Sequence, residues 1–237
     1  MRGLFITGTD TDVGKTFVTA AIARQLRAAG RRPGAYKPAC SGAERGHSGE
    51  PYWSDVEILA AATGIKNRNL ICPQCFEAPL APPVAANREG ASVSWQQMLD
   101  GVAHWQSAVD AQEIDLLLIE GVGGLLCPLT EEHTVADFAA AVGFPVIIVA
   151  RLGLGTINHT LLTIEAAQGR GLTVAGVILN DGQGLAETVA GQSNYEELNQ
   201  RTAVPLLGIF PFGGDSVRLR DGRTSARMDW HQLAQSQ

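Results

Sequence analysis

The chain has 237 residues, of which 45% are hydrophobic and 18% are charged. This composition suits a folded domain with a large core and excludes long disordered regions. The formal net charge of −6 leaves no overall positive field to attract nucleic acid or an anionic membrane, so a small-molecule partner is expected.

Short apolar runs alternate with helical stretches along the whole chain, a pattern typical of βαβ units because parallel strands need a helical crossover. In chain order, we predict strand 3–7, helix 15–29, strand 34–37, helices 55–62 and 95–111, strand 115–120, helix 135–141, strand 145–150, helix 157–168, strand 174–180, helix 185–201 and strand 205–210. Residues 79–83 are predicted to form a rigid, proline-rich loop.

The ends of the chain carry no sign of export. Residues 1–10 lack the apolar segment of a secretion signal, and no later run reaches the roughly 18 apolar residues of a membrane span. We therefore expect a cytoplasmic protein in which residues 1–237 form a single domain, with a loosely ordered tail after about residue 213.

The first predicted strand leads into a glycine-rich turn and then a helix, with the sequence Gly8-Thr9-Asp10-Thr11-Asp12-Val13-Gly14-Lys15-Thr16. A P-loop needs this context, because N–H groups of the turn and of the helix N-terminus bind phosphate oxygens. Lys15 would bridge the terminal phosphates and Thr16 would hold magnesium. Since Gly8 stands one residue earlier than in the usual pattern, a plain glycine-rich turn is the alternative. The pattern favours a P-loop NTPase-like α/β fold with an open, mostly parallel sheet and helices on both faces.

Two acidic residues are candidate magnesium ligands. Glu120 ends an apolar strand and precedes Gly121-Val122-Gly123-Gly124, so its carboxylate is expected at the carboxyl edge of the sheet, where ligands bind in open α/β folds. Asp55 stands at a predicted helix start, where it could instead complement the helix dipole.

Two further strand ends carry polar residues. Lys37 and Ser41 follow the second strand and would reach the same edge as the P-loop, although a lysine at a strand end can also simply extend to solvent. Asn180 follows a later strand and is either an adenine contact or an ordinary turn residue. No guanine-selective Asn-Lys-x-Asp sequence follows that strand, so ATP is preferred over GTP.

The four cysteines include the pair Cys72-Pro73-Gln74-Cys75. This spacing is that of half a zinc site, but no second Cys or His pair stands at a suitable distance. A pair of ordinary loop thiols is the preferred interpretation over zinc binding or redox activity.

Across residues 3–212 these motifs resemble the dethiobiotin synthetase family, ATP-dependent carboxylating ligases of biotin synthesis. The motifs that carry the resemblance are the P-loop itself, Tyr36-Lys37-Pro38 with Ser41-Gly42, Ser54-Asp55, Glu120-Gly121-Val122-Gly123-Gly124, Leu154-Gly155-Thr156-Ile157-Asn158-His159, Asn180-Asp181 and Pro205-Leu206-Leu207-Gly208. In this family the early first glycine of the P-loop is a regular feature.

The resemblance implies a role for each matching residue. ATP would contact Asp12, Val13, Gly14, Lys15, Thr16, Phe17, Asp55, Glu120, Gly121, Val122, Gly123, Asn180, Asp181, Phe210, Pro211 and Phe212. Magnesium would be held by Thr16, Asp55 and Glu120, and Lys15 and Lys37 would be catalytic. The substrate would contact Thr11, Lys37, Ser41, Gly155, Thr156, Ile157 and Asn158. The turn Phe210-Pro211-Phe212 departs from the family's usual Pro-Trp turn.

The implied reaction joins 7,8-diaminononanoate and CO2 at the expense of ATP, through a carbamate and a carbamic-phosphoric anhydride. Carbamate and γ-phosphate are both anions, so two lysines and magnesium would offset their repulsion. The start of the helix at 157 has free N–H groups that suit the substrate carboxylate, although it could equally be a plain capped helix start. In the family this segment comes from the second subunit of a homodimer, with a tyrosine nearby for which Tyr195 is the counterpart.

Two rival classes fit the residues less well. Amidotransferase-type ligases need a glutaminase domain for which the chain is too short. Partition and cell-division ATPases carry a lysine where Asp10 stands here, and often a basic amphipathic C-terminal helix, whereas residues 228–233 are not basic.

Overall fold

A computed structural model describes residues 2–46, 48–214, 218 and 228–235 of the chain. Six strands form one sheet in the order β10-β9-β8-β1-β7-β2, and every neighbouring pair is parallel. In chain order the strands are β1 (Gly3–Gly8), β2 (Pro33–Tyr36), β7 (Leu116–Glu120), β8 (Val146–Arg151), β9 (Val174–Asn180) and β10 (Leu206–Phe210). The predicted α/β class and all six predicted strands are confirmed.

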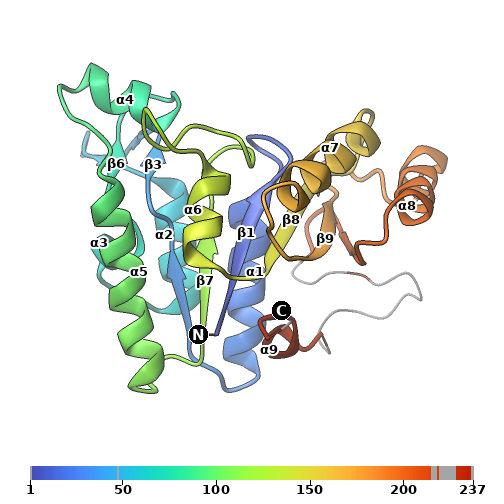
Figure 1. The fold of residues 1–237 in the computed structure, drawn as a ribbon, viewed down its shortest axis with the longest axis horizontal. Helices are drawn as coiled ribbons and strands as arrows, with labels where there is room; N and C mark the ends of the chain where they lie inside the picture. Colours follow the sequence, from blue (N-terminus) through green and yellow to red (C-terminus); the bar gives the residue numbers. More distant parts are fainter. Residues whose placement is uncertain (1, 47, 215–217, 219–227, 236–237) are drawn as a thin grey trace.

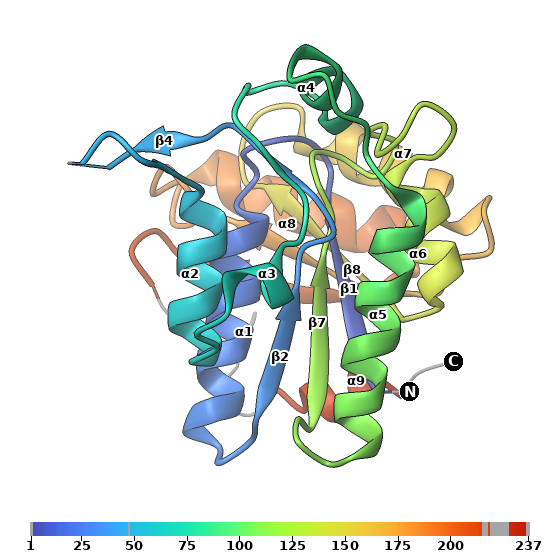
Figure 2. The ribbon, with the colours of Figure 1, turned by 90° about the vertical axis from the view of Figure 1, so that its left-hand side faces the viewer.

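Helices cover both faces of this sheet (Figures 1 and 2). One face packs against α1 (Lys15–Ala28) and α9 (Trp230–Leu233). The opposite face packs against α5 (Trp95–Asp110), α6 (Val135–Val142), α7 (Thr156–Gln168) and α8 (Val189–Arg201). At the β2 edge, α2 (Ser54–Thr63) and α3 (Arg68–Ile71) form a smaller core around Ala35.

The central strands are apolar on both sides because both sides are covered. In β1, Leu4 and Ile6 point toward α1, whereas Phe5 points toward α6 and its ring meets that of Phe138 edge-on. Successive side chains of a strand point to opposite faces, so a continuous apolar run contributes side chains to the hydrophobic cores on both faces of the sheet. Each such buried side chain contributes about 1.5–3 kcal/mol of hydrophobic stabilisation.

Short elements outside this frame were not predicted. They are the parallel pair β3 (Cys40–Ser41) and β6 (Cys75–Phe76), the antiparallel pair β4 (Glu44–Arg45) and β5 (Pro51–Tyr52), α4 (Pro82–Arg88), and the short helices α3 and α9. The predicted loop at 79–83 is wrong in its second half, because Pro82 and Pro83 occupy the first turn of α4, where a missing N–H does no harm.

The last predicted helix starts later than expected. The backbone N–H groups of Leu185 and Ala186 bind the Asp181 carboxylate, and Thr188 caps α8 by accepting from the N–H of Gly191. Residues 185–188 therefore form a loop, and α8 begins at Val189.

The tail predicted after residue 213 lies partly outside the described residues. Within them, Arg218 pairs with Ile209 on the edge strand β10 through two backbone hydrogen bonds. Trp230 of α9 is buried and its Nε1 donates to Gln25 of α1 at 3.1 Å. No helix in the described part of the chain is long and apolar enough to cross a membrane.

The order of the strands places a ligand site at the end of β1. From β1 the chain continues to β2 on one side of the sheet, and after β7 it crosses to β8 on the other side. Loops on the two sides diverge from this point, which leaves a crevice at the carboxyl ends of the strands. The P-loop, which follows β1, lies at this crevice, at the upper edge in Figure 1.

Candidate active site

The turn from β1 into α1 has the conformation that phosphate binding requires. Asp12 and Gly14 both have positive φ, at 56° and 92°, so the backbone reverses tightly before α1 begins at Lys15. No side chain caps the first turn of α1, and its N–H groups stay free for an anion. A Cβ at residue 14 would also collide with the side-chain amide of Asn180, so this position requires glycine.

Lys15 is folded back over this turn. Its side chain is nearly buried, and Nζ donates a 2.9 Å hydrogen bond to the backbone oxygen of Asp10. Burial lowers the pKa of Lys15, and the nearby carboxylates of Glu120 and Asp55 oppose that shift. The ammonium group therefore lies beside the phosphate-binding turn without a close carboxylate partner of its own.

Glu120 is the centre of a cluster that joins the ends of two strands, β2 and β7, with the starts of two helices, α1 and α2. Its Oε1 accepts from Thr16 Oγ1 at 2.6 Å and from Lys37 Nζ at 2.7 Å, and Lys37 also contacts Asp55 Oδ2 at 2.7 Å. β2 lies beside β7 with Tyr36 opposite Ile119, so the next residues along, Lys37 and Glu120, meet at the sheet edge.

Burial and charge set the ionisation of this cluster. Burial alone would lower the pKa of Lys37, but the carboxylates of Glu120 and Asp55 outweigh it and raise that pKa well above its ordinary value. Burial would raise the pKa of Asp55, but the charge of Lys37 and hydrogen bonds from Lys37 and Thr16 hold it below its ordinary value. Lys37 is therefore a permanent cation near neutral pH and Asp55 a permanent anion.

The cluster also contains an acceptor with no partner. Glu120 is completely buried, and its second oxygen, Oε2, has no hydrogen-bond partner. A buried carboxylate oxygen without a partner is costly unless a cation or donor meets it. Together with the hydroxyl of Thr16 and the carboxylate of Asp55, it forms an all-oxygen donor set of the kind that magnesium prefers. These residues fit a magnesium ion.

A cavity of about 730 Å³ opens next to this cluster. It brings together residues from the P-loop, the segment after β2, the start of α2 and the loop after β7, namely Thr11, Asp12, Gly14, Lys15, Thr16, Phe17, Lys37, Ser41, Asp55, Val122 and Gly123. Of the residues assigned to this region from the sequence, three do not line it: Glu120 and Val13 are buried beneath it, and Gly121 packs against Val135.

The cavity has a wall that the sequence did not predict. Cys40 and Cys127 line it, and Ile58 and residues 79–82 complete it. The two prolines that begin α4 are a sequence signal for the start of a helix in this segment. Its position over the P-loop could not be read from the sequence, because it depends on the pairing of β3 with β6.

The residues assigned to adenine are placed differently. Asn180 donates to the backbone oxygen of Val13 at 2.9 Å, and the buried carboxylate of Asp181 accepts from three backbone N–H groups within 3.3 Å. Phe210 is buried edge-on against Phe17, with ring centroids 4.9 Å apart. The side chains of Asn180, Asp181 and Phe210 are engaged within the chain, and none of these three lines the 730 Å³ cavity.

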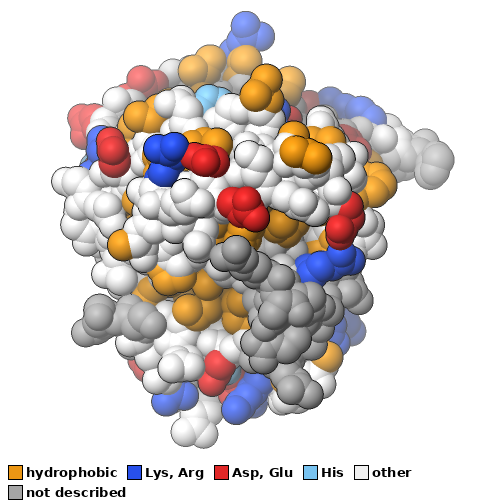
Figure 3. Space-filling model, turned by 90° about the vertical axis from the view of Figure 1, so that its right-hand side faces the viewer, with side chains coloured by type: hydrophobic (Ala, Val, Ile, Leu, Met, Phe, Trp, Pro, Cys, Tyr) orange, Lys and Arg blue, Asp and Glu red, His pale blue; other side chains and the backbone are white. Residues whose placement is uncertain are grey.

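The start of α7 does not line that cavity. Gly155 takes a left-handed conformation and no side chain caps the helix, so its first N–H groups are free. Thr156 is buried and Asn158 is exposed, but residues 155–158 do not line the cavity. Apolar side chains lie at the surface of the face that α7 and α8 form (Figure 3), and the large ones are Leu154 (96% exposed), Leu162 (55%) and Val189 (85%).

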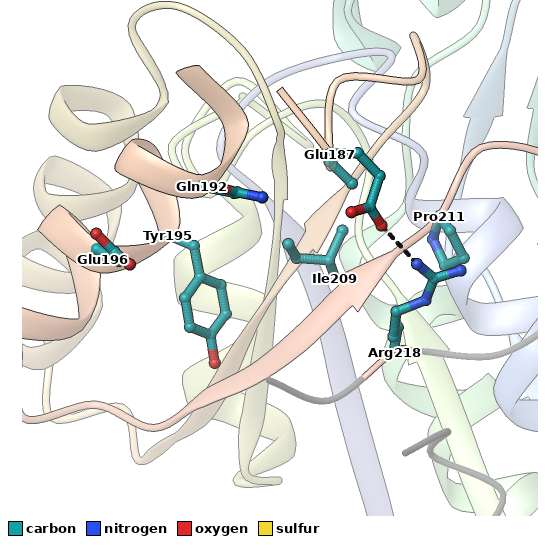
Figure 4. Close-up of a pocket in the computed structure, with 8 residues that line it drawn as sticks. Glu187, Gln192, Tyr195, Glu196, Ile209, Pro211 and Arg218 are labelled. Atoms are coloured by element: carbon teal, nitrogen blue, oxygen red, sulfur yellow. Dashed lines mark hydrogen bonds and ion pairs between the residues drawn. The ribbon is translucent and has the colours of Figure 1, made fainter. Parts of the chain in front are cut away.

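A second, smaller cavity of about 300 Å³ lies between α8 and β10 (Figure 4). Tyr195 and Ile209 line it, and an ion pair of 2.7 Å between Glu187 and Arg218 spans one side. Pro211 also lines this cavity, whereas Phe212 is 69% exposed. The turn assigned to adenine therefore borders the smaller cavity.

Comparisons with known proteins identify the family of the chain. A family model described as an AAA domain matches residues 2–218. Among curated relatives, the ATP-dependent dethiobiotin synthetase BioD of Anaeromyxobacter sp. (strain K) is 51% identical over 219 residues, covering 92% of this chain and 93% of the relative. The protein of the same name from Bacillus cereus (strain ATCC 14579) is 43% identical over 213 residues, covering 90% of this chain and 84% of the relative.

Solved structures share the fold at low identity. The cell division ATPase MinD of Pyrococcus furiosus superposes with a TM-score of 0.51 at 17% identity, covering 99% of this chain and 97% of that one. FtsY of Mycoplasma mycoides gives 0.52 at 14% identity, covering 91% of this chain and 62% of that one. At such identities the likeness concerns the fold alone. The extensive match to the curated relatives is what decides the assignment, and the chain belongs to the ATP-dependent dethiobiotin synthetase family.

Proposed function

We propose that this chain converts 7,8-diaminononanoate, CO2 and ATP into dethiobiotin, ADP and phosphate. The observation that carries the proposal is the cluster of Lys37, Glu120, Asp55 and Thr16 beside the P-loop, around one cavity. Membership of the dethiobiotin synthetase family supports the choice of substrates. The site belongs to a step of biotin synthesis in the cytoplasm.

Thr16, Asp55 and Glu120 would hold a magnesium ion in this site. The ion would supply positive charge to the phosphate oxygens of ATP. The unpartnered Oε2 of Glu120 supports this role, because it is a buried acceptor with no donor of its own.

Lys37 would act as a fixed cation between the two substrates. Because the pKa of Lys37 is raised, its amine stays protonated at neutral pH and cannot accept a proton, so its contribution is electrostatic. The carbamate and the γ-phosphate both carry negative charge, and a buried ammonium lowers the energy of bringing them together. Lys15 would do the same at the terminal phosphates, where it must leave the Asp10 backbone oxygen.

The cavity walls would place the two amines of the substrate. Thr11 and Ser41 line the cavity together with Lys37, and their hydroxyls can bond an amine or a carbamate. One amine would capture CO2 as a carbamate, whose oxygen attacks the γ-phosphate. The second amine would then attack the carbamate carbon and expel phosphate, which closes the ring. Holding both amines in one cavity makes the last step effectively intramolecular.

The substrate carboxylate would be bound by a second copy of the chain. The free N–H groups at the start of α7 suit an anion, but they lie outside the cavity of their own chain. Leu154, beside this helix start, is 96% exposed, which favours burial against another protein surface. A homodimer would cover this surface and bring the helix start of one chain to the cavity of the other.

A nucleotide-switch ATPase of the partition or cell-division type is not favoured. The likeness to MinD is at 17% identity and concerns the fold alone.

The direct test is to incubate the chain with diaminononanoate, bicarbonate, magnesium and ATP and to detect dethiobiotin and ADP by mass spectrometry. Equal amounts of both products, each dependent on the diamine, are expected. ATP hydrolysis that proceeds at the same rate without the diamine would reject the proposal in favour of a nucleotide switch.

A further inference from the structure

Three of the four cysteines gather beneath the active-site segment. Cys72 follows α3 and Cys75 begins β6, so the pair Cys72-Pro73-Gln74-Cys75 forms the connection between these elements. β6 pairs in parallel with β3, and this register places Cys75 directly beside Cys40. The proposed ligation chemistry makes no use of these thiols.

Cys72 and Cys75 have the asymmetry of a reactive dithiol. Cys72 is buried, and its Sγ lies 3.5 Å from the backbone oxygen of Gln74. Cys75 is only partly buried, and its Sγ lies 3.7 Å from the backbone oxygen of Cys72. Cys75 is therefore the more accessible residue of the pair, and Cys72 is the buried one.

The environment of the two sulfurs agrees with this geometry. A hydrogen bond from Cys72 and the charge of Lys37 lower the pKa of Cys75, whereas burial raises that of Cys72. The thiolate is the form that attacks an oxidant, so Cys75 would react first.

The dithiol is joined by backbone hydrogen bonds to the catalytic segment. Lys37 N donates to the backbone oxygen of Ile71 at 2.7 Å, and Cys40 N donates to that of Gln74 at 2.9 Å. Gly42 N continues the series, donating to Phe76 at 3.1 Å. The segment 71–76 is thus the template on which Lys37 and Ser41 are held, and a change of shape between Cys72 and Cys75 must reach both.

We propose that Cys72 and Cys75 are a thiol-oxidation site that forms a reversible disulfide with a peroxide as oxidant, and that this disulfide slows ligation by shifting the Lys37–Ser41 segment. The Cys75 thiolate attacks a peroxide oxygen and displaces hydroxide, giving a sulfenic acid. The Cys72 sulfur then attacks the Cys75 sulfur and releases water. Two thiols are oxidised and one hydrogen peroxide is reduced to two molecules of water.

The test treats the reduced full-length protein with stoichiometric hydrogen peroxide and follows thiols, mass and rate. We expect two of the four thiols to disappear, the mass to fall by about 2 Da, and peptide mapping to join Cys72 to Cys75. Ligation should slow by about tenfold or more, since a displacement of about 1 Å near reacting groups can cost up to ~100-fold. Dithiothreitol should restore the rate, and binding of a non-hydrolysable ATP analogue should change little.

Variants identify the responsible sulfurs, with each rate compared to that of the same variant before oxidation. In the wild-type protein, peroxide should lower the ligation rate and dithiothreitol should restore it. Neither Cys75→Ser, at a partly exposed position, nor Cys72→Ala should show this reversible inhibition. Cys127→Ser is the matched control, because Cys127 lies in the loop between β7 and α6, outside the connection from α3 to β6, and should leave the disulfide and its effect in place.

Several results would overturn the proposal. They are four thiols that stay free after peroxide, a disulfide that maps to Cys40 and Cys75 instead, stoichiometric zinc in the reduced protein, or a disulfide between Cys72 and Cys75 that leaves the rate unchanged. Thiol loss and mapping are measured without the ligation reaction, so failure of the proposed function would be seen separately.

Discussion

The two halves of the sheet's carboxyl edge are built differently. In the phosphate half, which follows β1, β2 and β7, the side chains of Thr16, Lys37 and Glu120 meet one another around a cavity. In the distal half, which follows β8, β9 and β10, Asn180 and Asp181 bond to the backbone instead. In the phosphate half the side chains bond to one another, whereas in the distal half they bond to the backbone of loops, and no side chain caps the start of α7.

The largest effect is expected from the lysine of the phosphate half. Lys15→Ala should lower kcat/KM by at least about 1000-fold, because it removes a preorganised cation from the transferred phosphate. The fold should persist, as judged by circular dichroism. The chain has only three lysines, and Lys66→Ala, at an exposed position, is the matched control that should keep full activity. An active Lys15→Ala enzyme would mean that the P-loop does not bind the reacting nucleotide.

Lys37→Gln separates chemistry from nucleotide binding in the same half. Ligation should fall by about 100-fold or more while ATP affinity measured by calorimetry changes little, since Lys37 faces the place where the two anions meet. Loss of ATP affinity as large as in Lys15→Ala would assign Lys37 to the nucleotide instead.

The same variant should also change stability. Without Lys37, the carboxylates of Glu120 and Asp55 face each other unneutralised, and breaking a buried ion pair costs about 3–5 kcal/mol. Because Asp55 is 38% exposed, the cost should fall at or below the lower end of that range. Magnesium should restore much of the lost Tm in Lys37→Gln.

The two carboxylates should differ in their effect on magnesium. Glu120→Gln should raise the magnesium concentration for half-maximal activity by about tenfold or more, because a neutral amide oxygen holds a hard cation less well. Asp55→Asn should do so less strongly, since its carboxylate is partly solvated. Manganese binding followed by electron paramagnetic resonance gives the same comparison without turnover. Unchanged metal binding in both variants would remove them from the metal site.

The smallest effect on catalysis is expected in the distal half. Asp181→Ala leaves three backbone N–H groups without their partner, which should cost about 1–3 kcal/mol of unfolding free energy. The rate at saturating ATP should stay within about twofold of wild type, because this carboxylate is buried and does not line the 730 Å³ cavity. A tenfold higher KM for ATP at unchanged stability would show instead that Asp181 contacts the base directly.

The proposed homodimer predicts a recovery of activity when two inactive variants are mixed. Asn158→Asp places a like charge beside the substrate carboxylate, and Lys15→Ala disables the P-loop. After subunit exchange, each mixed dimer would unite an intact P-loop with an intact helix start at one site, which returns about a quarter of wild-type activity in an equimolar mixture. No recovery, with exchange confirmed by mass measurement on tagged chains, would place each complete site within one chain.

The sequence predicted the phosphate half well because its signals are local. The P-loop is contiguous, and Glu120 follows an apolar run whose end must lie at the sheet edge. The contact between Lys37 and Glu120 is not local: it depends on β2 lying beside β7 rather than β1, which no periodicity reveals.

The distal half shows what local sequence signals do not reveal. The resemblance implies an ATP contact for Asp181, and the structure adds that its carboxylate binds the backbone of the loop that precedes α8. The sequence cannot distinguish an acidic turn residue that binds a ligand from one that binds the backbone. The backbone partners are N–H groups, which are present in every sequence. Likewise, Trp230 lies in a polar segment, and only tertiary packing against α1 makes its short helix part of the core.

The measurement that tests the central claim most directly follows an oxygen atom. If a carbamate formed from CO2 attacks the γ-phosphate and ring closure then expels phosphate, that phosphate must keep one oxygen from the carbamate. A rapid single-turnover reaction in ordinary water, with diaminononanoate, magnesium, ATP and freshly added ¹⁸O-labelled CO2, should yield dethiobiotin and phosphate carrying one ¹⁸O atom. Unlabelled phosphate, formed before the added CO2 exchanges its label with water, would show that ATP is hydrolysed by water and would contradict the account.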